Sequence, residues 1–262
     1  TIASTGNATD FGDLTVARGR LSPCSDGTKG VFGGGFNGSA DVNTIDYITI
    51  STTGNATDFG DLTVARNHIA ACSDGTKGVW GGGYDSSNSN VIDYITIATT
   101  GNALDFGNLT VARNATGACS DGTKGVWGGG EDASANVNTI DYITIATTGN
   151  ALDFGDLTVV RARVGACSND TRGLWGGGTP TTNTIDYITI ASTGNATDFG
   201  DLTVARYGLA ACSDGTYGVW GGGYVSGEVN TIDYITIATT GNASDFGDLT
   251  VARRHFHACS GN

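Results

Sequence analysis

The chain has 262 residues, of which 43 are glycine, and it still carries enough aliphatic and aromatic residues to build a folded core. Its formal net charge is −13, and its 13 Lys and Arg residues are spread thinly along the chain, which argues against binding to nucleic acid or to an anionic membrane surface. No apolar run approaches the roughly 20 residues that span a bilayer, so we expect no membrane insertion.

One unit recurs along the whole chain. Cysteines recur at intervals of 45 to 48 residues, "DYITI" occurs five times and "DFG" six times. All the variation in length lies between the glycine triplet and the Ile of "IDYITI", a segment of 6 to 9 residues. A fixed period of this length, without helical patterning, predicts a four-stranded β-propeller blade. A β-solenoid is the competing architecture, but its coils are usually much shorter.

The expected elements follow the same order in each unit. Thr1 and Ile2 end a third strand, and Asp10 to Val16 ("DFGDLTV") forms the fourth, outermost strand of the incomplete unit that precedes the first complete one. A strand ending in Cys and Ser is then followed by Asp-Gly, a pair that favours a tight hairpin. "TKGVWGGG" forms the next strand, with glycines where another backbone comes close. "IDYITI" is β-branched and aromatic, as a strand should be. In the second unit the four expected strands, a to d, are 67–73, 76–83, 91–97 and 105–111.

The unit "ARNHIAACSDGTKGVWGGGYDSSNSNVIDYITIATTGNALDFGNLTVAR" resembles a kelch repeat. An Arg opens the unit, a strand ends in glycines, "VIDYI" stands at the hydrophobic-acidic-Tyr strand, and "ALDF" replaces Asn-x-Trp. The departures are a glycine triplet instead of a doublet, Phe for the later Trp, and no Pro-Met before the Arg. The resemblance covers essentially the whole chain and implies an all-β kelch-like propeller. Tandem repeats of this style resemble those in structural or tail-associated proteins of bacteriophages.

The count of repeated strands predicts the number of blades. We expect one domain over residues 1–262, built as six four-stranded blades. The C-terminal strand, His255 to Ser260, would join the strand at Asp10 to Val16 in the sixth blade. The two strands between them would lie in about 20 residues upstream of this sequence, an estimate from the repeat period. The alternative is five complete blades with leftover strands.

Three repeated residue types have structural interpretations. The cysteines occupy one equivalent position on strand a, and symmetry-related positions seldom meet the geometry of a disulfide, so we expect buried free thiols and assembly in a reducing compartment. The repeated Arg is expected to pair with the buried Asp of "IDYITI". The Asn of the repeated "TTGNA" turn is expected to serve the turn. The six cysteines are Cys24, Cys72, Cys119, Cys167, Cys212 and Cys259. The six arginines are Arg18, Arg66, Arg113, Arg161, Arg206 and Arg253.

Residues with the potential for catalysis or metal binding are few. His255 and His257 alternate in "HFH" and share one face of a strand, but a third ligand is missing, so no metal is expected. No nucleophile–base pair and no phosphate-binding loop stands out. The sequence therefore predicts a protein without cofactors that is not an enzyme.

The units diverge in only two places. Strands alternate in direction, so the d–a and b–c connections emerge on one face of the disc and the a–b and c–d turns on the other. The d–a and b–c segments differ from unit to unit, whereas the a–b and c–d turns barely change. Loops drift when they are unconstrained, yet the divergent segments also collect the residue types that anchor interfaces. The residues expected to contact a partner are Arg20, Leu21, Phe36, Asn37, His68, Tyr84, Asp85, Glu131, Asp132, Arg163, Tyr207, Tyr224, Arg254 and Phe256.

These patterns leave three functions to weigh. The first is a binding or structural module that recognises a protein or glycan receptor through the divergent face, in a virion appendage or a surface adhesin. The second is a propeller lectin with one carbohydrate pocket per blade, on the uniform turns or between blades. The third, an enzyme with its site in the central channel, needs an asymmetric polar cluster that the sequence does not show. We favour the first, with the protein located on a virion or at a cell surface.

Overall fold

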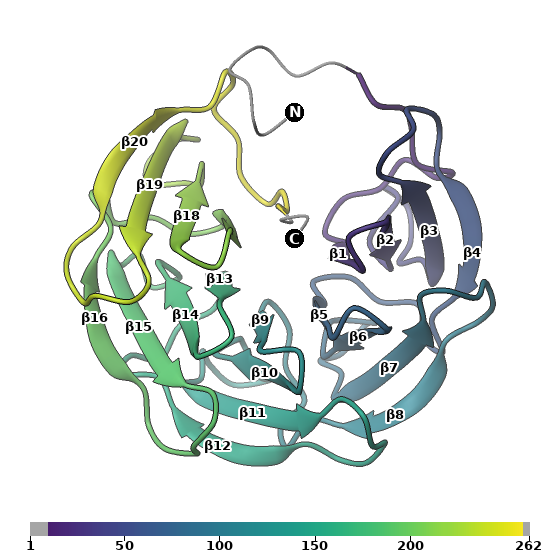
Figure 1. The fold of residues 1–262 in the computed structure, drawn as a ribbon, viewed down its shortest axis with the longest axis horizontal. Helices are drawn as coiled ribbons and strands as arrows, with labels where there is room; N and C mark the ends of the chain where they lie inside the picture. The colour runs from purple at the N-terminus through teal and green to yellow at the C-terminus, as the bar shows by residue number, and fades with distance from the viewer. Residues whose placement is uncertain (1–9, 259–262) are drawn as a thin grey trace.

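A computed structural model describes residues 10–258 as a β-propeller of five antiparallel four-stranded sheets arranged around a central axis (Figure 1). None of these residues forms a helix able to cross a membrane. Blade 1 comprises β1 (Ser22–Ser25), β2 (Lys29–Gly33), β3 (Thr44–Thr49) and β4 (Thr57–Asp61). Blade 2 comprises β5 (Ala70–Ser73), β6 (Lys77–Gly81), β7 (Val91–Thr96) and β8 (Leu104–Asn108). Blade 3 comprises β9 (Gly117–Ser120), β10 (Lys124–Gly128), β11 (Thr139–Thr144) and β12 (Leu152–Asp156). Blade 4 comprises β13 (Gly165–Ser168), β14 (Arg172–Gly176), β15 (Thr184–Thr189) and β16 (Thr197–Asp201). Blade 5 comprises β17 (Ala210–Ser213), β18 (Tyr217–Gly221), β19 (Thr231–Thr236) and β20 (Ser244–Asp248).

Each blade runs outwards from its first strand, which lies nearest the axis, to its fourth strand at the rim (Figure 1). The strands at positions a and d are shorter than the sequence predicts. In blade 2, β5 starts at Ala70, because Asn67 pairs with Tyr84 outside the sheet and His68 and Ile69 line the cavity at the axis. β8 ends at Asn108, because the next residues cross to blade 3: Leu109 is buried there, and the Thr110 hydroxyl donates to Asp141.

The hydrophobic core lies between blades. Four clusters of buried side chains fill the four interfaces between successive blades, and each contains a Trp from the later blade. In the second interface, the Trp127 indole N–H donates to the Ala70 carbonyl at 3.1 Å. Gly125 leaves space for the thiol of Cys72, because a Cβ at position 125 would lie only 2.7 Å from the Cys72 Sγ. Cysteine and glycine therefore recur together because each thiol of one blade packs on a glycine of the next.

The three glycines of the triplet each make a different close approach. In blade 2, a Cβ on Gly81 would lie 2.8 Å from the Trp127 ring, and one on Gly82 would lie 2.6 Å from the Arg113 carbonyl oxygen. The Gly83 N–H donates to that same carbonyl at 2.9 Å, with φ at +115°. A side chain at Gly81 or Gly82 would push blade 3 away from blade 2, whereas a Cβ on Gly83 would lie 2.5 Å from the Ile69 side chain of its own blade.

A buried ion pair ties each blade to the connection that enters it. Arg113 leaves the rim of blade 2, and its Nη1 lies 2.9 Å from Oδ2 of Asp141 on β11 of blade 3. Both side chains are fully buried, and Thr110 adds its hydroxyl and its backbone N–H to the same carboxylate. Burial lowers the pKa of Arg113, and the Asp141 carboxylate opposes that shift. The expected pairing is confirmed in all five blades: Arg18–Asp46, Arg66–Asp93, Arg113–Asp141, Arg161–Asp186 and Arg206–Asp233.

The structure supports the five-blade alternative, and the six-blade prediction is wrong for the described residues. Four successive pairs of blades pack together, but β17 of blade 5 has no such contact with β1 of blade 1. The C-terminal segment enters the opening between these two blades and runs towards the axis (Figure 1). The expected closing strand over His255 to Ser260 is absent as far as Ala258, and its last residues lie outside the described part of the chain.

The expected strand over Asp10 to Val16 is also absent, although its residues pack where such a strand would lie. The Gly54 N–H donates to the Phe11 carbonyl at 2.8 Å, in the same way as the Gly101 N–H donates to Phe59 on β4 at 2.7 Å. The difference is that β4 pairs with β3 of its own sheet, whereas no described strand pairs with the first segment. The segment follows a strand-like path without the ladder that would make it a strand.

Replacing one buried carboxylate should test the ion pair. Asp141→Asn leaves Arg113 buried without a counter-charge, which typically costs about 3–5 kcal/mol. Asp153→Asn, the same change on the exposed strand of the same blade, should alter the free energy of unfolding by less than about 0.5 kcal/mol. Urea unfolding of both variants measures the difference, and equal effects would show that the pair does not hold blades 2 and 3 together.

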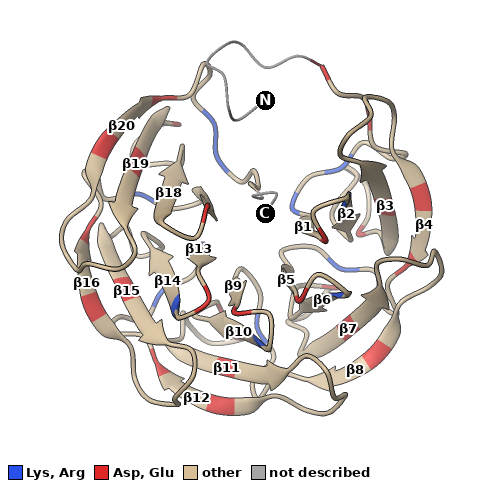
Figure 2. Cartoon of the chain, viewed as in Figure 1, with Lys and Arg blue, Asp and Glu red and all other residues tan. Residues whose placement is uncertain are grey.

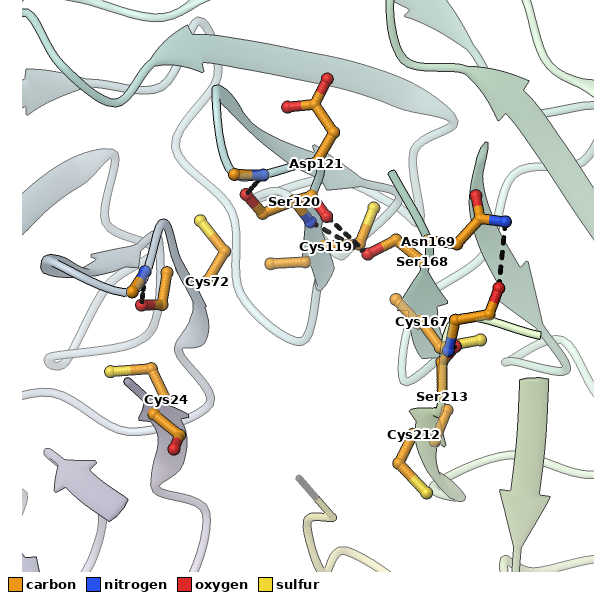
Figure 3. A pocket seen from close by; sticks show the side chains of 18 of the residues that line it. Cys24, Cys72, Cys119, Ser120, Asp121, Cys167, Ser168, Asn169, Cys212 and Ser213 are labelled. Carbon is orange, nitrogen blue, oxygen red and sulfur yellow. Dashed lines mark hydrogen bonds between the residues drawn. The ribbon is translucent and has the colours of Figure 1, made fainter. Parts of the chain in front are cut away.

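The cysteines lie around the central channel, as Figure 3 shows for the five that are described. Cys24, Cys72, Cys119 and Cys167 are buried, as expected, but Cys212 is only half-buried. Cys72, Cys119 and Cys167 are free thiols, and burial raises the pKa of each. The prediction for Cys259 concerns a residue outside the described part of the chain.

Thiol alkylation at pH 8 should distinguish these sites. Cys72, Cys119 and Cys167 should react slowly in the native protein, because burial suppresses the thiolate and blocks access to it. In denaturant without reductant all six cysteines should react. Mass spectrometry of the labelled peptides gives both results, and rapid native labelling of these three sites would show that the interface between blades opens freely.

Candidate binding face

The two divergent segments of each blade are joined by backbone hydrogen bonds. In blade 2, the Asn67 N–H donates to the Tyr84 carbonyl at 3.0 Å, and the Tyr84 N–H donates back at 2.8 Å. The corresponding pairs in the other blades are Gly19 with Phe36, Asn114 with Glu131, Ala162 with Thr179, and Tyr207 with Tyr224. The d–a segments and b–c loops therefore form one surface, which we call the variable face.

Most of the residues expected to contact a partner reach this surface. Tyr84 is the most exposed of the aromatic ones, at 41%. Leu21 is a correction: it is 9% exposed and turns away from this surface, towards a hollow that Phe32 and Ile48 also line, so it adds little to the variable face. The exposed residues are Arg20, Asn37, Tyr84 and Arg254. The half-buried residues are Phe36, His68, Asp85, Glu131, Asp132, Arg163, Tyr207, Tyr224 and Phe256.

Aromatic and cationic side chains contact one another on the variable face. The rings of Tyr207 and Tyr224 have centroids 5.4 Å apart, and the Arg254 guanidinium lies 4.3 Å from the centroid of Tyr224. Tyr207 also approaches the ring of His255, at 6.5 Å between centroids. The structure thus brings together, at blade 5, side chains that lie far apart in the sequence.

Six residues form a ring of backbone hydrogen bonds where the variable face meets the axis. Each has a left-handed backbone, with φ between 52° and 67°, and each N–H after the first donates to the carbonyl of the preceding member at 2.8 to 3.0 Å. We call this the mouth ring. Its members, in order, are Arg20, His68, Ala115, Arg163, Gly208 and His255. Five non-glycine residues in this conformation hold their side chains in fixed directions, and strained backbone of this kind clusters at functional sites.

Sequence reasoning missed part of this ring. It singled out Arg20, His68 and Arg163, but not Ala115 and Gly208, and it considered His255 only as a metal ligand. The signal was present, because all six occupy one equivalent position, two residues after the repeated Arg. Their shared backbone conformation becomes visible only in the folded ring.

The mouth ring encloses histidines that are uncharged at neutral pH. Burial lowers the pKa of His68 from 6.5 to about 3, and the positive charges of Arg20 and Arg163 add to the effect. The pKa of His255 is lowered by burial and by Arg254, Arg163 and Arg20. The rings of His68 and His255 meet edge to face, with centroids 6.2 Å apart. Each neutral imidazole has one N–H donor and one acceptor nitrogen available to this small space.

The opposite face is built from turns that repeat the same hydrogen bonds. The Asp74 carboxylate accepts from the N–H groups of Thr76 and Lys77, and Asn169 accepts in the same way in blade 4. The Asn55 side chain accepts from the Asp13 N–H, which joins blade 1 to the first segment, so this Asn links neighbouring segments. The side chains of the uniform turns thus make hydrogen bonds that the fold itself requires.

A cavity of about 400 Å³ at the axis opens among these uniform turns, and a hollow of about 470 Å³ lies between the first segment, blade 1 and the C-terminal segment. Figure 3 shows its wall of cysteines and serines, in which Ser168 donates to the Ser120 carbonyl at 2.7 Å. A second cavity of about 100 Å³ and a third of about 60 Å³ continue from it to the mouth ring. Within residues 10–258, no group of three or more His, Cys, Asp or Glu side chains is placed to hold a metal ion.

Comparison with known proteins adds no identification. No family model and no curated protein matches the chain. The propeller architecture is shown by the structure, whereas the likeness to kelch repeats rests on the quoted motif alone.

The pH dependence of stability should report on His68. Because its pKa is about 3 in the folded protein and 6.5 when unfolded, the unfolded chain binds more protons between these values, and stability falls as pH is lowered through that window. The slope from one such group approaches about 1.4 kcal/mol per pH unit. Between pH 7 and pH 5, His68→Gln should show a shallower loss of unfolding free energy than the wild type. Identical slopes would show that His68 is charged in the fold.

Proposed function

We propose that the protein is a non-enzymatic binding module that recognises a protein or glycan receptor through the variable face, as part of a virion appendage or a surface adhesin. The observation that carries this proposal is that five blades with the same framework present five different sets of side chains on one face. A rigid scaffold with divergent loops is a common way to build a recognition surface. The propeller fold is in general compatible with a binding or structural role.

The hydrogen bonds within and between blades explain why the turns on the face opposite the variable face are uniform. Its turns close hairpins through Asp74 and its equivalents, and they join blades through Asn55 and its equivalents. Uniformity there follows from structural need and does not by itself mark the variable face as functional. The composition of the variable face supplies the separate argument, because Tyr84 is exposed and Arg254 stacks on Tyr224. Tyr and Arg are the residue types that most often dominate binding energy at interfaces.

The lectin alternative places similar sugar pockets on the uniform turns or between blades. The polar side chains of those turns already serve the protein itself: the Asp74 Oδ1 accepts two backbone N–H groups, and the Asn55 Oδ1 accepts a third. A set of five equivalent sugar sites would have to compete with these bonds. On the variable face, the exposed side chain of Tyr84 is not engaged in such a turn.

A loop graft should separate the framework from the recognition surface. Replacing residues 84–90 with the five residues of 179–183 should preserve the fold, because Thr179 pairs with Ala162 through the same backbone bonds that Tyr84 makes with Asn67. Receptor binding should fall at least about tenfold, because an exposed aromatic anchor is lost and such anchors are typically worth about 2 kcal/mol or more. Retention of labelled protein on a glycan array and on intact bacterial cells measures the effect.

Asp74→Asn is the matched control on the uniform face. Asn169 already makes the same turn in blade 4, so this variant should fold normally and bind as the wild type does. If grafts in several blades leave binding intact while substitutions in the uniform turns abolish it, the variable face is not the recognition surface. A lectin with one pocket per blade would instead lose only part of its avidity in each variant.

A further inference from the structure

The positive charges of this acidic chain divide into three groups. Six of the 13 Lys and Arg residues are the repeated arginines, of which five are buried against Asp. Four more start strand b: Lys29, Lys77, Lys124 and Arg172. Each of these donates to the carbonyl of the Ile that directly follows the third strand of the next blade, near the uniform face. The three that remain are Arg20, Arg163 and Arg254. All three belong to the d–a segments of the variable face.

All three histidines of the chain gather at the same place. The cavity of about 60 Å³ at the mouth ring is lined by Arg20, Arg163, His68, His255 and His257, and no Asp or Glu lines it. Glu131 lies outside this cavity, with its Oε2 3.6 Å from the Arg163 Nη2 at the partly exposed rim. Elsewhere acidic residues mark the outer strands of the disc, as Figure 2 shows. A basic pocket at the axis of a chain with net charge −13 therefore needs an explanation.

The backbone of the mouth ring fixes these side chains before any ligand arrives. The N–H of Arg163 donates to Ala115 at 2.8 Å, and the N–H of His255 donates to Gly208 at 2.8 Å. The small residues leave room for the large ones: a Cβ on Gly208 would lie 3.1 Å from the His255 ring. Donors held in place in this way lose little entropy when a ligand binds.

An independent observation points to a polar occupant. Thr116 lines the same cavity, is 8% exposed, and its Oγ1 has no hydrogen-bond partner among the described residues. The equivalent positions in neighbouring units are apolar: Ile69, Val164 and Leu209. A buried hydroxyl without a partner is costly unless something bonds to it.

We propose that the mouth ring binds the carboxylate group of a ligand, a deeper assignment that rests on the proposed recognition role of the variable face. The guanidinium groups of Arg20 and Arg163 match the two oxygens of a carboxylate, and the imidazole and Thr116 hydroxyl groups add donors. The cavity of about 60 Å³ has room for a group the size of a carboxylate. The rest of the ligand lies outside, against Tyr207 and Tyr224.

The three histidines make the site directly observable by NMR, because no other histidine contributes signals. Glucuronate and N-acetylglycine serve as probes, the first for a carboxylate from an acidic sugar and the second for one from a peptide C-terminus. Glucose, N-acetylglycinamide and inorganic phosphate serve as comparators. A carboxylate in the ring should shift the imidazole signals saturably and raise the pKa of His68, because the anion stabilises the imidazolium form. The stronger of the two probes identifies the source.

Two variants and a control test the named donors. Arg163→Gln should weaken binding of the stronger probe at least about tenfold, and Thr116→Val about threefold, as expected for charged and neutral hydrogen bonds. Lys77→Gln removes the same charge near the uniform face and should leave the affinity unchanged. Thermal unfolding of each variant verifies that it is folded. The assignment is supported if folded Arg163→Gln and Thr116→Val lose affinity for the probe while Lys77→Gln keeps it.

The proposal is overturned if neither carboxylate shifts the histidine signals, if neutral comparators shift them equally, or if only phosphate does. It is also overturned if Lys77→Gln weakens binding as much as Arg163→Gln. None of these measurements uses the receptor. A negative titration together with receptor binding that is sensitive to loop grafts would therefore reject the carboxylate site alone. A positive titration together with insensitive receptor binding would reject the proposed function of the face.

Discussion

The buried pair between an arginine of one connection and an aspartate of the next blade is the interaction on which this propeller depends. Arg113 and Asp141 carry full charges out of water, which is costly unless the charges are paired and hydrogen-bonded. Thr110 donates twice to the carboxylate and the Trp127 carbonyl accepts from Arg113, while the Arg113 Nε has no hydrogen-bond partner among the described residues. Because the arginine belongs to the connection that enters the blade and the aspartate to the third strand of that blade, the pair fixes the path of the connection across the sheet, and its repetition gives five blades one geometry.

Close packing around this pair divides the molecule into a constrained part and a free part. The thiol of Cys72 requires a glycine at position 125, and the indole of Trp127 requires one at position 81. The uniform turns are tied to neighbouring segments through side chains such as Asn55. The d–a segments and b–c loops are held mainly by backbone hydrogen bonds, to each other as between Asn67 and Tyr84 and from blade to blade in the mouth ring, and these bonds do not depend on the identity of the side chain. Divergence is therefore permitted on one face by the same packing that forbids it on the other.

The axis links these two parts. Going from the uniform face to the variable face, the channel passes from cysteines and serines to the layer of Ile69, Thr116 and Val164, and then to the mouth ring. The basic side chains at the end of this path lie in an overall acidic protein, where burial keeps His68 uncharged at neutral pH. The side chains of Arg20 and Arg163 thus meet the three histidines at the centre of the variable face, where residues from separate blades converge.

The sequence by itself determined the repeated unit, its four strands and the identity of the divergent segments, because these depend on local patterns: alternation, Asp-Gly turns and the spacing of "GGG" from "IDYITI". It also determined the Arg–Asp pairing, since a buried carboxylate in a repeated unit needs a repeated partner. Only the tertiary structure decided the number of blades, because a segment such as Asp10 to Val16 becomes a strand only where a neighbour completes its ladder. It also decided that Leu21 is buried and that His255 reaches His68 across the axis. Such contacts depend on the curvature of the whole ring, which no single unit encodes.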